Sequence, residues 1–562
     1  MTNVSAKRAR GTLYLALRPF QVNPPTQFLN TPGGVTQITQ IRREGASVIV
    51  NGDRRVECVT APGGFGASTY DGGNIVAALR HGTLPLEDHV TDSFGYASAA
   101  LSYPIDLAAG AQRVVDLVVP LGTRAAAAAA PTSRGMDAGR RGRARGVAPV
   151  ARSDFVPAAG LRRRDRPHAA RADRLHPGEP RRPRHPARVA RAYERSWIRD
   201  GALTCSALLR VGHADQARAF LDWFGDYQFA NGKVPCCVDH RGPDPVPEND
   251  SPGEYVYLVA ETYRLTHDRA IAERHWPRVA AAVAYLDSLR RTRRTPEYQK
   301  EGQRQFYGLL TPSISHEGYS AKPMHSYWDD LFALRGFADA VFLAHVLGRA
   351  ADEARIQGVR DEFARDLRAS IETTMAVHKI DYVPGCADLG DFDATSTTIA
   401  LSPVQAGRAV PEPALERTFE KYWSFFEDRR GGRADWDAFT PYEMRAIGSF
   451  VRLGRRDRAN ALLDWFMTFR RPPGFRAWAE VAGKDARTPR FIGDLPHTWV
   501  GSDFVRSVLD MIAYEREQDD ALVLGAGIPE SWLQGDGVRV RGLVTRWGAL
   551  DFMARSDGRG SR

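Results

Sequence analysis

The sequence lacks long apolar runs and has few cysteines. No stretch of about 18 apolar residues occurs in the 562-residue chain, which argues against a membrane-spanning helix. The opening residues MTNVSAKRARGTLYLALRPF hold too short an apolar stretch for a signal peptide. The five cysteines lack metal-ligand spacing, and the adjacent Cys236 and Cys237 cannot easily bridge each other. We therefore expect a reduced cytoplasmic protein with no metal, no organic cofactor and no membrane partner.

Outside one segment, the chain also lacks an excess of positive charge. The net charge is +10, but residues 134–195 alone carry +12 from 18 arginines and six acidic residues, so the remainder is at −2. A role in binding nucleic acid would rest on this segment only, and we expect no nucleic-acid partner. Hydrophobic residues make up 43% of the chain, enough for a large core and more than one domain.

The segment 124–190 differs in composition from the rest. It is built from Arg, Ala, Pro and Gly, with little periodicity and almost nothing large to bury. It could be a basic arm for polyanions, a disordered linker, or the product of a displaced reading frame in a GC-rich gene. We favour the frame shift, because HPARVAR (185–191) can be encoded so that another frame reads Ile-Gln-Pro-Gly-Ser-Arg, which joins well onto AYERSWIRDG.

The periodicity changes along the chain. Residues 1–123 contain short alternating runs such as GTLYLALRPF and QRVVDLVVPL, which predict an antiparallel β-sandwich, either complete or incomplete. Residues 191–525 are helical in period, and LLRVGHADQARAFLDWF (208–224) is echoed by FVRLGRRDRANALLDWF (450–466) and more loosely by residues 345–363. Each copy predicts a helical hairpin turned by a left-handed glycine: Gly212, Gly454 and Gly348. Residues 526–562 predict two short strands of a truncated β segment.

Carboxylates and indoles recur where the predicted helices begin. The relevant stretches are YERSWIRDGAL, VPENDSPGEYVY, SYWDD, and FRAWAEV followed by PHTWVGSDF. Singly, each has a plain structural explanation: an Arg–Asp pair is usually an ion pair, and Asp329 with Asp330 could merely place charge at a helix N-terminus, worth up to about 1 kcal/mol. Together they suggest a sugar site, because Trp offers a stacking face and Asp with Arg offers paired hydrogen bonds to hydroxyls.

Cleavage of a glycosidic bond requires two carboxyl groups on opposite sides of the bond. The acid must stay protonated, which a neighbouring like charge and an apolar wall both favour. Asp329, beside Asp330 and Trp328, meets that description, and Glu480, beside Trp478, is the best partner to activate water. An inverting arrangement would hold the two roughly 6.5–9.5 Å apart.

These motifs resemble those of the six-hairpin (α/α)6-barrel glycosidases, in particular the glucoamylase-like and amylo-α-1,6-glucosidase-like branch. WIRD is similar to the W-x-R-D motif that holds the terminal sugar, and YWDD is similar to W-E-E, with Asp in place of the acid Glu. WAEV followed by HTW is similar to the segment of the catalytic base. The resemblance implies an N-terminal β-sandwich followed by an (α/α)6 toroid, with Asp329 as acid and Glu480 as base. It further implies sugar contacts from Trp197, Arg199, Asp200, Asp250, Trp328, Asp330, Trp478, His497 and Trp499.

The leading hypothesis is therefore an inverting glycoside hydrolase that acts on an α-glucan or oligosaccharide. Two alternatives stay open: a disaccharide phosphorylase on the same fold, in which phosphate replaces the water, and a non-catalytic or decayed carbohydrate-binding protein. Sugar identity, linkage and oligomeric state are not determined by the motifs.

Overall fold

The computed structural model describes residues 1–18, 38–69, 72, 75–93, 95–119, 195–239, 241–470, 478–485 and 497–556. The anomalous segment 124–190 lies outside the described residues. The chain forms two compact units. We call Met1–Arg152 with Arg470–Pro496 the N-terminal unit, and Ser153–Phe469 with His497–Arg562 the helical unit.

The N-terminal unit contains two sheets that share one core. The first has the order β1 (Ala9–Leu17), β7 (Ser98–Leu107), β5 (Gly64–Ser68); the second has the order β6 (His89–Thr91), β2 (Gln40–Glu44), β3 (Ser47–Val50), β4 (Arg54–Cys58), β8 (Leu117–Val118). Neighbouring strands pair antiparallel throughout. The core combines side chains of both sheets, among them Ile41, Val48, Leu101 and Tyr103. The antiparallel character predicted for this region is confirmed. Short elements α1 (Ile75–Arg80) and β13 (Ala482–Gly483) complete the unit.

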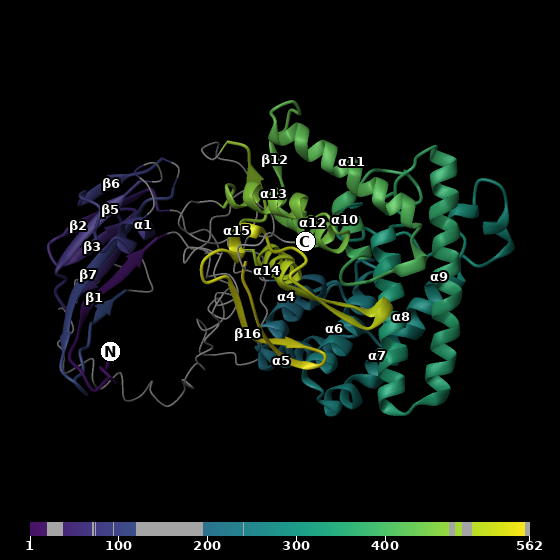
Figure 1. Cartoon of the computed structure of the whole chain (residues 1–562), viewed down its shortest axis with the longest axis horizontal. Coiled ribbons are helices and arrows are strands. Elements are labelled where there is room, and N and C mark those ends of the chain that lie inside the picture. Colours follow the sequence, from purple (N-terminus) through teal and green to yellow (C-terminus); the bar gives the residue numbers. More distant parts are fainter. Residues whose placement is uncertain are drawn as a thin grey trace. The chain divides into compact units, whose positions relative to one another are not determined.

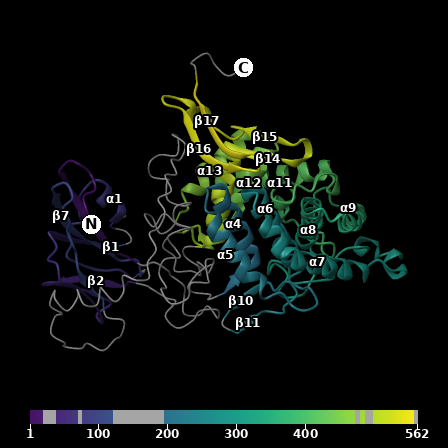
Figure 2. The same ribbon diagram turned by 90° about the horizontal axis from the view of Figure 1, so that it is seen from below.

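In the helical unit, one set of helices is linked by successive contacts (Figures 1 and 2). Helix α14 (Thr498–Ile512) contacts α4 (Ile198–Arg210), which contacts α6 (Ser251–Thr266), which contacts α8 (Tyr327–Leu347). Helix α12 (Arg445–Arg452) contacts α14, and the turn η3 (Thr398–Ala400) contacts both α8 and α12. Helices α4 and α8 bury side chains on nearly all sides over their first turns, which identifies this set as the interior one.

A second set of helices covers the first. Helices α5 (Ala214–Gly225), α7 (Arg269–Arg291), α9 (Ala350–His378) and α13 (Arg456–Met467) each follow an interior helix in the chain and pack on it, while α11 (Glu412–Arg430) packs on α10 (Ala394–Thr397). Helix α9 buries only one stripe of side chains, as expected for a helix with one face in water. The predicted hairpin glycines Gly212, Gly348 and Gly454 have φ values of +88°, +71° and +71°, so their predicted left-handed conformation is confirmed.

The approach of α6 to α8 depends on glycine. A Cβ on Gly253 would lie 2.1 Å from the backbone oxygen of Phe332, and a Cβ on Gly336 would lie 2.9 Å from the Cα of Gly253. No side chain fits at either point. The first turn of α6 is therefore held against α8 just beyond the first turn of that helix.

Two antiparallel pairs lie near the end of the helical unit: β14 (Ala513–Arg516) with β15 (Ala521–Leu524), and β16 (Val538–Thr545) with β17 (Gly548–Ala554). The second pair confirms the two predicted C-terminal strands. Among the helices in the described ranges, none combines the length and apolar character needed to cross a membrane. The remaining short elements are β9 (Ser196–Trp197), β10 (Cys237–Asp239), β11 (Gly242–Pro243), η1 (Pro296–Gln299), η2 (Arg304–Phe306), η4 (Gly407–Ala409), β12 (Ala438–Phe439), η5 (Pro441–Met444), η6 (Glu517–Asp519) and α15 (Glu530–Leu533).

Candidate active site

The first turns of α4, α6 and α8, together with the loop that leads into α6, bring six acidic side chains to one region of the helical unit. We call Asp200, Glu248, Asp250, Glu254, Asp329 and Asp330 the carboxylate cluster. All six are at most 3% exposed. Buried carboxylates require compensation by cations or hydrogen bonds, or must be neutral. How each member is compensated indicates what the cluster can do.

Arg199 is the cation at the centre of the cluster. Residue 197 ends β9 in an extended conformation, and α4 begins at the next residue, which directs Arg199 into the interior. Its Nη1 donates to Glu248 Oε2 at 2.9 Å and lies 3.9 Å from Asp250 Oδ2, while its Nε lies 3.8 Å from Asp200 Oδ2. Burial alone would lower the pKa of Arg199, but these negative charges raise it well above its usual value.

Asp250 is held by an indole. Trp328 Nε1 donates to Asp250 Oδ2 at 2.8 Å, and the hydroxyl of Ser251 donates to Asp250 Oδ1 at 3.3 Å. Burial raises the pKa of Asp250, while Arg199 and the Trp328 hydrogen bond act in the opposite direction. Asp250 thus joins the start of α6 to the start of α8.

Asp329 is buried at the start of α8, where two serine hydroxyls contact it and the charge of Asp250, rather than that of Asp330, acts on it. The hydroxyl of Ser313 donates to Asp329 Oδ2, and that of Ser315 donates to Oδ1 at 2.7 Å. Burial and then the charge of Asp250 raise the pKa of Asp329 to about 8, although both serine hydrogen bonds lower it. A carboxyl with this pKa is protonated at neutral pH. Ser315 has a φ of +54°, so the loop that supplies its hydroxyl is held in a conformation unfavourable for a residue with a side chain.

Two further acids are buried with little compensation. Asp330 Oδ1 accepts from the backbone N–H of Leu310 at 2.9 Å, but within the described residues Oδ2 has no hydrogen-bond partner. Among the residues that the structure describes, neither carboxyl oxygen of Glu254 has a hydrogen-bond partner. Burial raises the pKa of both groups well above their usual values. Burial therefore favours the protonated form of both groups.

Aromatic rings close one side of the cluster. The guanidinium carbon of Arg199 lies 4.7 Å from the centre of the Trp499 ring, and Trp499 lies 4.1 Å from Tyr442 and 6.4 Å from Trp328 between ring centres. Arg445 lies 5.2 Å from the Trp328 ring and 5.4 Å from the Trp499 ring, and its Nη1 donates to Asp503 Oδ2 at 3.1 Å. These rings supply both stacking faces and a low-dielectric wall, which raises the pKa of buried carboxyls.

His316 lies against the same wall. Its ring centre is 4.8 Å from that of Trp328, and its Nε2 is 2.6 Å from the hydroxyl oxygen of Ser396. Burial lowers the pKa of His316 to about 4, against the opposing charge of Asp393. His316 is therefore a neutral hydrogen-bonding side chain at neutral pH.

The contacts above connect most of the predicted site residues, namely Arg199, Asp200, Asp250, Trp328, Asp329, Asp330 and Trp499. His497 joins through Tyr442, whose hydroxyl lies 2.8 Å from His497 Nε2. Trp197 is buried on β9, where it pairs with Cys237. Trp478 and Glu480 belong to the second segment of the N-terminal unit, and their role beside Asp329 stays a prediction.

Several residues of the site carried no sequence signal strong enough to be selected. Ser313 and Ser315 lie in the stretch SISHEG, which belongs to none of the motifs quoted above. Arg445 and Tyr442 occur in PYEMRAIGS, which matches none of the motifs. Glu254 follows a helix start and is indistinguishable in sequence from a solvated first-turn acid.

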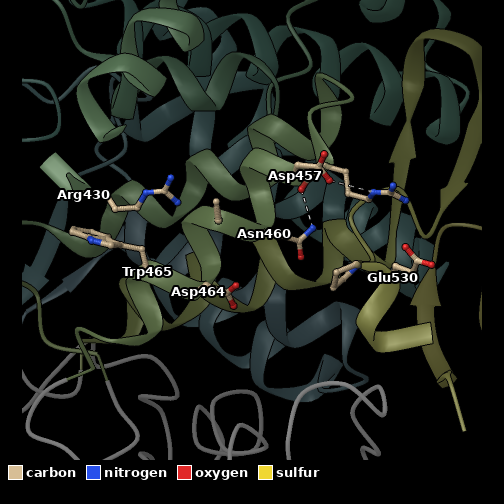
Figure 3. A pocket seen from close by; sticks show the side chains of 9 residues that line it. Arg430, Asp457, Asn460, Asp464, Trp465 and Glu530 are labelled. Carbon is tan, nitrogen blue, oxygen red and sulfur yellow. Dashed lines mark hydrogen bonds and ion pairs between the residues drawn. The ribbon is translucent and has the colours of Figure 1, made fainter. Parts of the chain in front are cut away.

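A separate hollow of about 620 Å³ lies on helices α11, α13 and α15 (Figure 3). Figure 3 shows Trp465 and Arg430 on one side of it and Glu530 on the other, with Asp457, Asn460 and Asp464 between them. It contains none of the predicted site residues. Both acidic side chains and arginines line this hollow, so it has no excess of one charge. We assign it no role in catalysis.

Neither the family models nor the curated proteins contain a match to this chain. Among solved structures, it is similar to a GH78 family rhamnosidase of Bacillus sp. GL1, with a TM-score of 0.49 and 11% identity over 91% of this chain and 46% of that one. It is also similar to an α-L-rhamnosidase from Dictyoglumus thermophilum (TM-score 0.48, 13% identity, 96% and 53%) and to a bacterial glucoamylase complexed with acarbose (TM-score 0.46, 10% identity, 89% and 77%). This chain spans about half the length of the two rhamnosidases. With TM-scores below 0.5, these similarities assign no function, and we infer it from the side chains.

Proposed function

We propose that this protein is an inverting glycoside hydrolase acting on an α-linked glucan or oligosaccharide. The observation that carries the proposal is Asp329, a buried carboxyl with a pKa of about 8 that the charge of Asp250 helps to raise. Asp250 in turn contacts Trp328 and Arg199. A general acid has to hold its proton near neutral pH and release it to a leaving oxygen. A purely structural aspartate would normally be paired with a cation instead.

Binding of the sugar follows from the chemistry around this acid. Arg199 with Asp200 and Asp250 offers charged donors and acceptors for adjacent hydroxyls, and Trp499 offers a ring face for the apolar side of a pyranose. Binding energy at these groups would orient the glycosidic oxygen toward Asp329. The proton would move from Asp329 to that oxygen as the bond to the anomeric carbon breaks.

We assign the role of base to Glu480, which would remove a proton from the water that attacks the anomeric carbon. This part of the proposal rests on the WAEV motif and its resemblance to the segment of the base in six-hairpin glycosidases. It requires a separation from Asp329 of roughly 6.5–9.5 Å, which leaves room for the water.

The proposed fold is an (α/α)6 toroid. The contacts among α14, α4, α6 and α8, and those of η3 with α8 and α12, follow the order expected for the inner helices of such a ring. The outer helices α5, α7, α9, α11 and α13 occupy the second layer that this fold requires. In this arrangement the helix starts that carry the carboxylate cluster face one end of the ring.

The test is a glycan hydrolysis screen with the anomer of the first product followed by NMR, using protein with a verified reading frame. We expect hydrolysis of an α-linked substrate with inversion. Asp329→Asn and Glu480→Gln should each abolish turnover while substrate binding by calorimetry is retained. Glu420→Gln, which alters an exposed ion pair with Arg458 on the outer helices, is the control and should remain fully active.

Three outcomes would contradict the proposal. Full activity in either site variant would exclude the corresponding assignment. Product formation that requires phosphate and tolerates loss of Glu480 would indicate a phosphorylase. Calorimetric sugar binding without turnover across the panel would indicate a non-catalytic binding protein.

A further inference from the structure

Two adjacent cysteines lie side by side at the start of β10. Side chains of neighbouring residues in a strand point to opposite faces. Cys236, however, precedes the strand in a bend, and β10 begins at Cys237. The two sulfur atoms therefore lie on the same side, 3.4 Å apart, and both side chains are 2% exposed.

A short hairpin brings a carboxylate to these sulfurs. Strand β10 pairs with β11, and Asp244 follows directly; its backbone N–H donates to the carbonyl of Cys237 at 2.9 Å. As a result, the two sulfurs and a carboxylate oxygen of Asp244 all lie within 4.8 Å of one another. The Asp244 side chain is 30% exposed, so the site has one side open to solvent while the thiols remain covered.

We propose that Cys236, Cys237 and Asp244 bind a thiophilic divalent cation of the Zn²⁺ class. Two sulfurs and one oxygen, with water in a fourth position, form a ligand set that suits Zn²⁺. With metal–sulfur bonds of about 2.3 Å and tetrahedral angles, the sulfurs would lie about 3.8 Å apart. The observed 3.4 Å requires a movement of only a few tenths of an ångström.

The surrounding charges fit the loaded site. Two thiolates, one carboxylate and one divalent cation sum to a net charge of −1. Arg195 lies 3.9 Å from Cys237 Sγ and 3.7 Å from Asp244 Oδ2. The ammonium of Lys233 donates to the backbone oxygens of Pro245 and Val246 just beyond Asp244. These two cations offset the residual negative charge of the loaded site. Arg195 does so in part only, because it also pairs with Asp239.

Metal binding must displace protons. The hydrogen bond with Cys237 and then burial raise the pKa of the Cys236 thiol. Two protons leave as the two thiols become thiolates, and the three ligands together with the bound cation then carry a net charge of −1. Because both thiols must lose their protons to bind the cation, affinity should increase with pH.

The site adjoins the proposed sugar-binding residues without sharing a side chain with them. Cys237 pairs with Trp197 in the β9–β10 sheet, and the carbonyl of Cys236 accepts from the N–H of Ile198 at 2.9 Å. A bound cation would fix the bend that supports the start of α4. Metal binding and glycosidase activity are nevertheless separate properties, and each can be measured without the other.

The experiment titrates the reduced full-length protein with Co²⁺ and follows the thiolate-to-cobalt charge-transfer band and the visible bands of tetrahedral cobalt. We expect one equivalent of Co²⁺ to bind, Zn²⁺ to displace it, and affinity to increase with pH as stated. Cys236→Ser and Cys237→Ser should each remove most of the charge-transfer intensity, and Asp244→Asn should weaken binding about 10- to 100-fold. Cys205→Ala, which removes another buried thiol, is the control and should leave the spectrum unchanged.

If the serine variants fail to fold, the wild-type protein still decides the matter. Saturating Zn²⁺ should protect Cys236 and Cys237, but not Cys205, from alkylation in mild denaturant, as mapped by mass spectrometry. Absence of a charge-transfer band, equal alkylation with and without Zn²⁺, or cobalt binding that survives loss of both cysteines would overturn the proposal.

Discussion

Removal of either serine hydroxyl that contacts Asp329 should shift the pH dependence of catalysis to higher pH. Ser313 and Ser315 donate to the two oxygens of this carboxylate, and both hydrogen bonds stabilise its charged form. Without one of them, burial and the charge of Asp250 are opposed less strongly. The pKa of Asp329 should therefore rise further in Ser313→Ala and in Ser315→Ala.

The size of the shift follows from the energy of a hydrogen bond to a charged group, about 1.5–3 kcal/mol. Because one pKa unit corresponds to about 1.4 kcal/mol, the shift should be about 1–2 units. An acid that titrates at about 8 loses activity above that pH, since the fraction that holds a proton falls. In the variants this loss should begin about 1–2 pH units higher.

The assay is kcat/KM as a function of pH, measured on the substrate that the glycan screen identifies. Ser370→Ala is the matched control: Ser370 is equally buried and hydrogen-bonded to Tyr327, but it contacts no carboxylate. Its profile should keep the wild-type basic limb. If the basic limb stays in place in both site variants, or moves to lower pH, Asp329 is not the group that limits activity at high pH.

Two further predictions concern stability. In a denaturant titration, Gly253→Ala should lower the free energy of unfolding by about 1–3 kcal/mol, because its Cβ would meet the backbone of Phe332. Gly358→Ala is the matched control, because a Cβ at that position would meet nothing within 4 Å. This variant should raise the free energy of unfolding by up to about 1 kcal/mol. An unaffected Gly253→Ala would contradict the close approach of α6 to α8, and a destabilised Gly358→Ala would contradict the open space around that residue of α9. His316 is held in the neutral form in the folded protein, where its pKa is about 4, whereas the imidazole of the unfolded chain has a pKa of 6.5. The folded state is therefore most stable above pH 6.5 and loses stability as the pH falls toward 4. The free energy of unfolding of the wild type should fall by about 3 kcal/mol relative to that of His316→Gln over this pH range. A difference between the two proteins that does not change with pH would refute the lowered pKa of His316.

Local patterns determine what could be predicted from the sequence. The left-handed glycines Gly212, Gly348 and Gly454 end helices through backbone interactions within a few residues, so their role was visible in the repeat. The carboxylates at the starts of α4, α6 and α8 could be selected because acids, arginine and tryptophan recur there. The contacts that join them, from Arg199 to Asp250 and from Asp250 to Trp328, follow from helix packing that no single segment encodes.

Other features depend on contacts between distant residues. Ser315 acts on Asp329 only because a loop with positive φ turns its hydroxyl inward, and Arg445 reaches the Trp328 ring from a helix more than a hundred residues away. Glu254 reads as a solvated first-turn acid until the packing of α6 shows it fully buried. Likewise, adjacent cysteines gave no metal-ligand spacing, since the third ligand comes from the far side of a hairpin.

The most direct test of the central claim compares two leaving groups in the Asp329→Asn variant. A glycosyl fluoride of the substrate sugar needs no proton donor because fluoride leaves unaided, whereas the natural glycoside does. We predict that Asp329→Asn loses hydrolysis of the natural glycoside while it retains hydrolysis of the fluoride, and that Glu480→Gln loses both. Equal loss of both substrates in Asp329→Asn, or full activity on the natural glycoside, would contradict the assignment of Asp329 as the general acid.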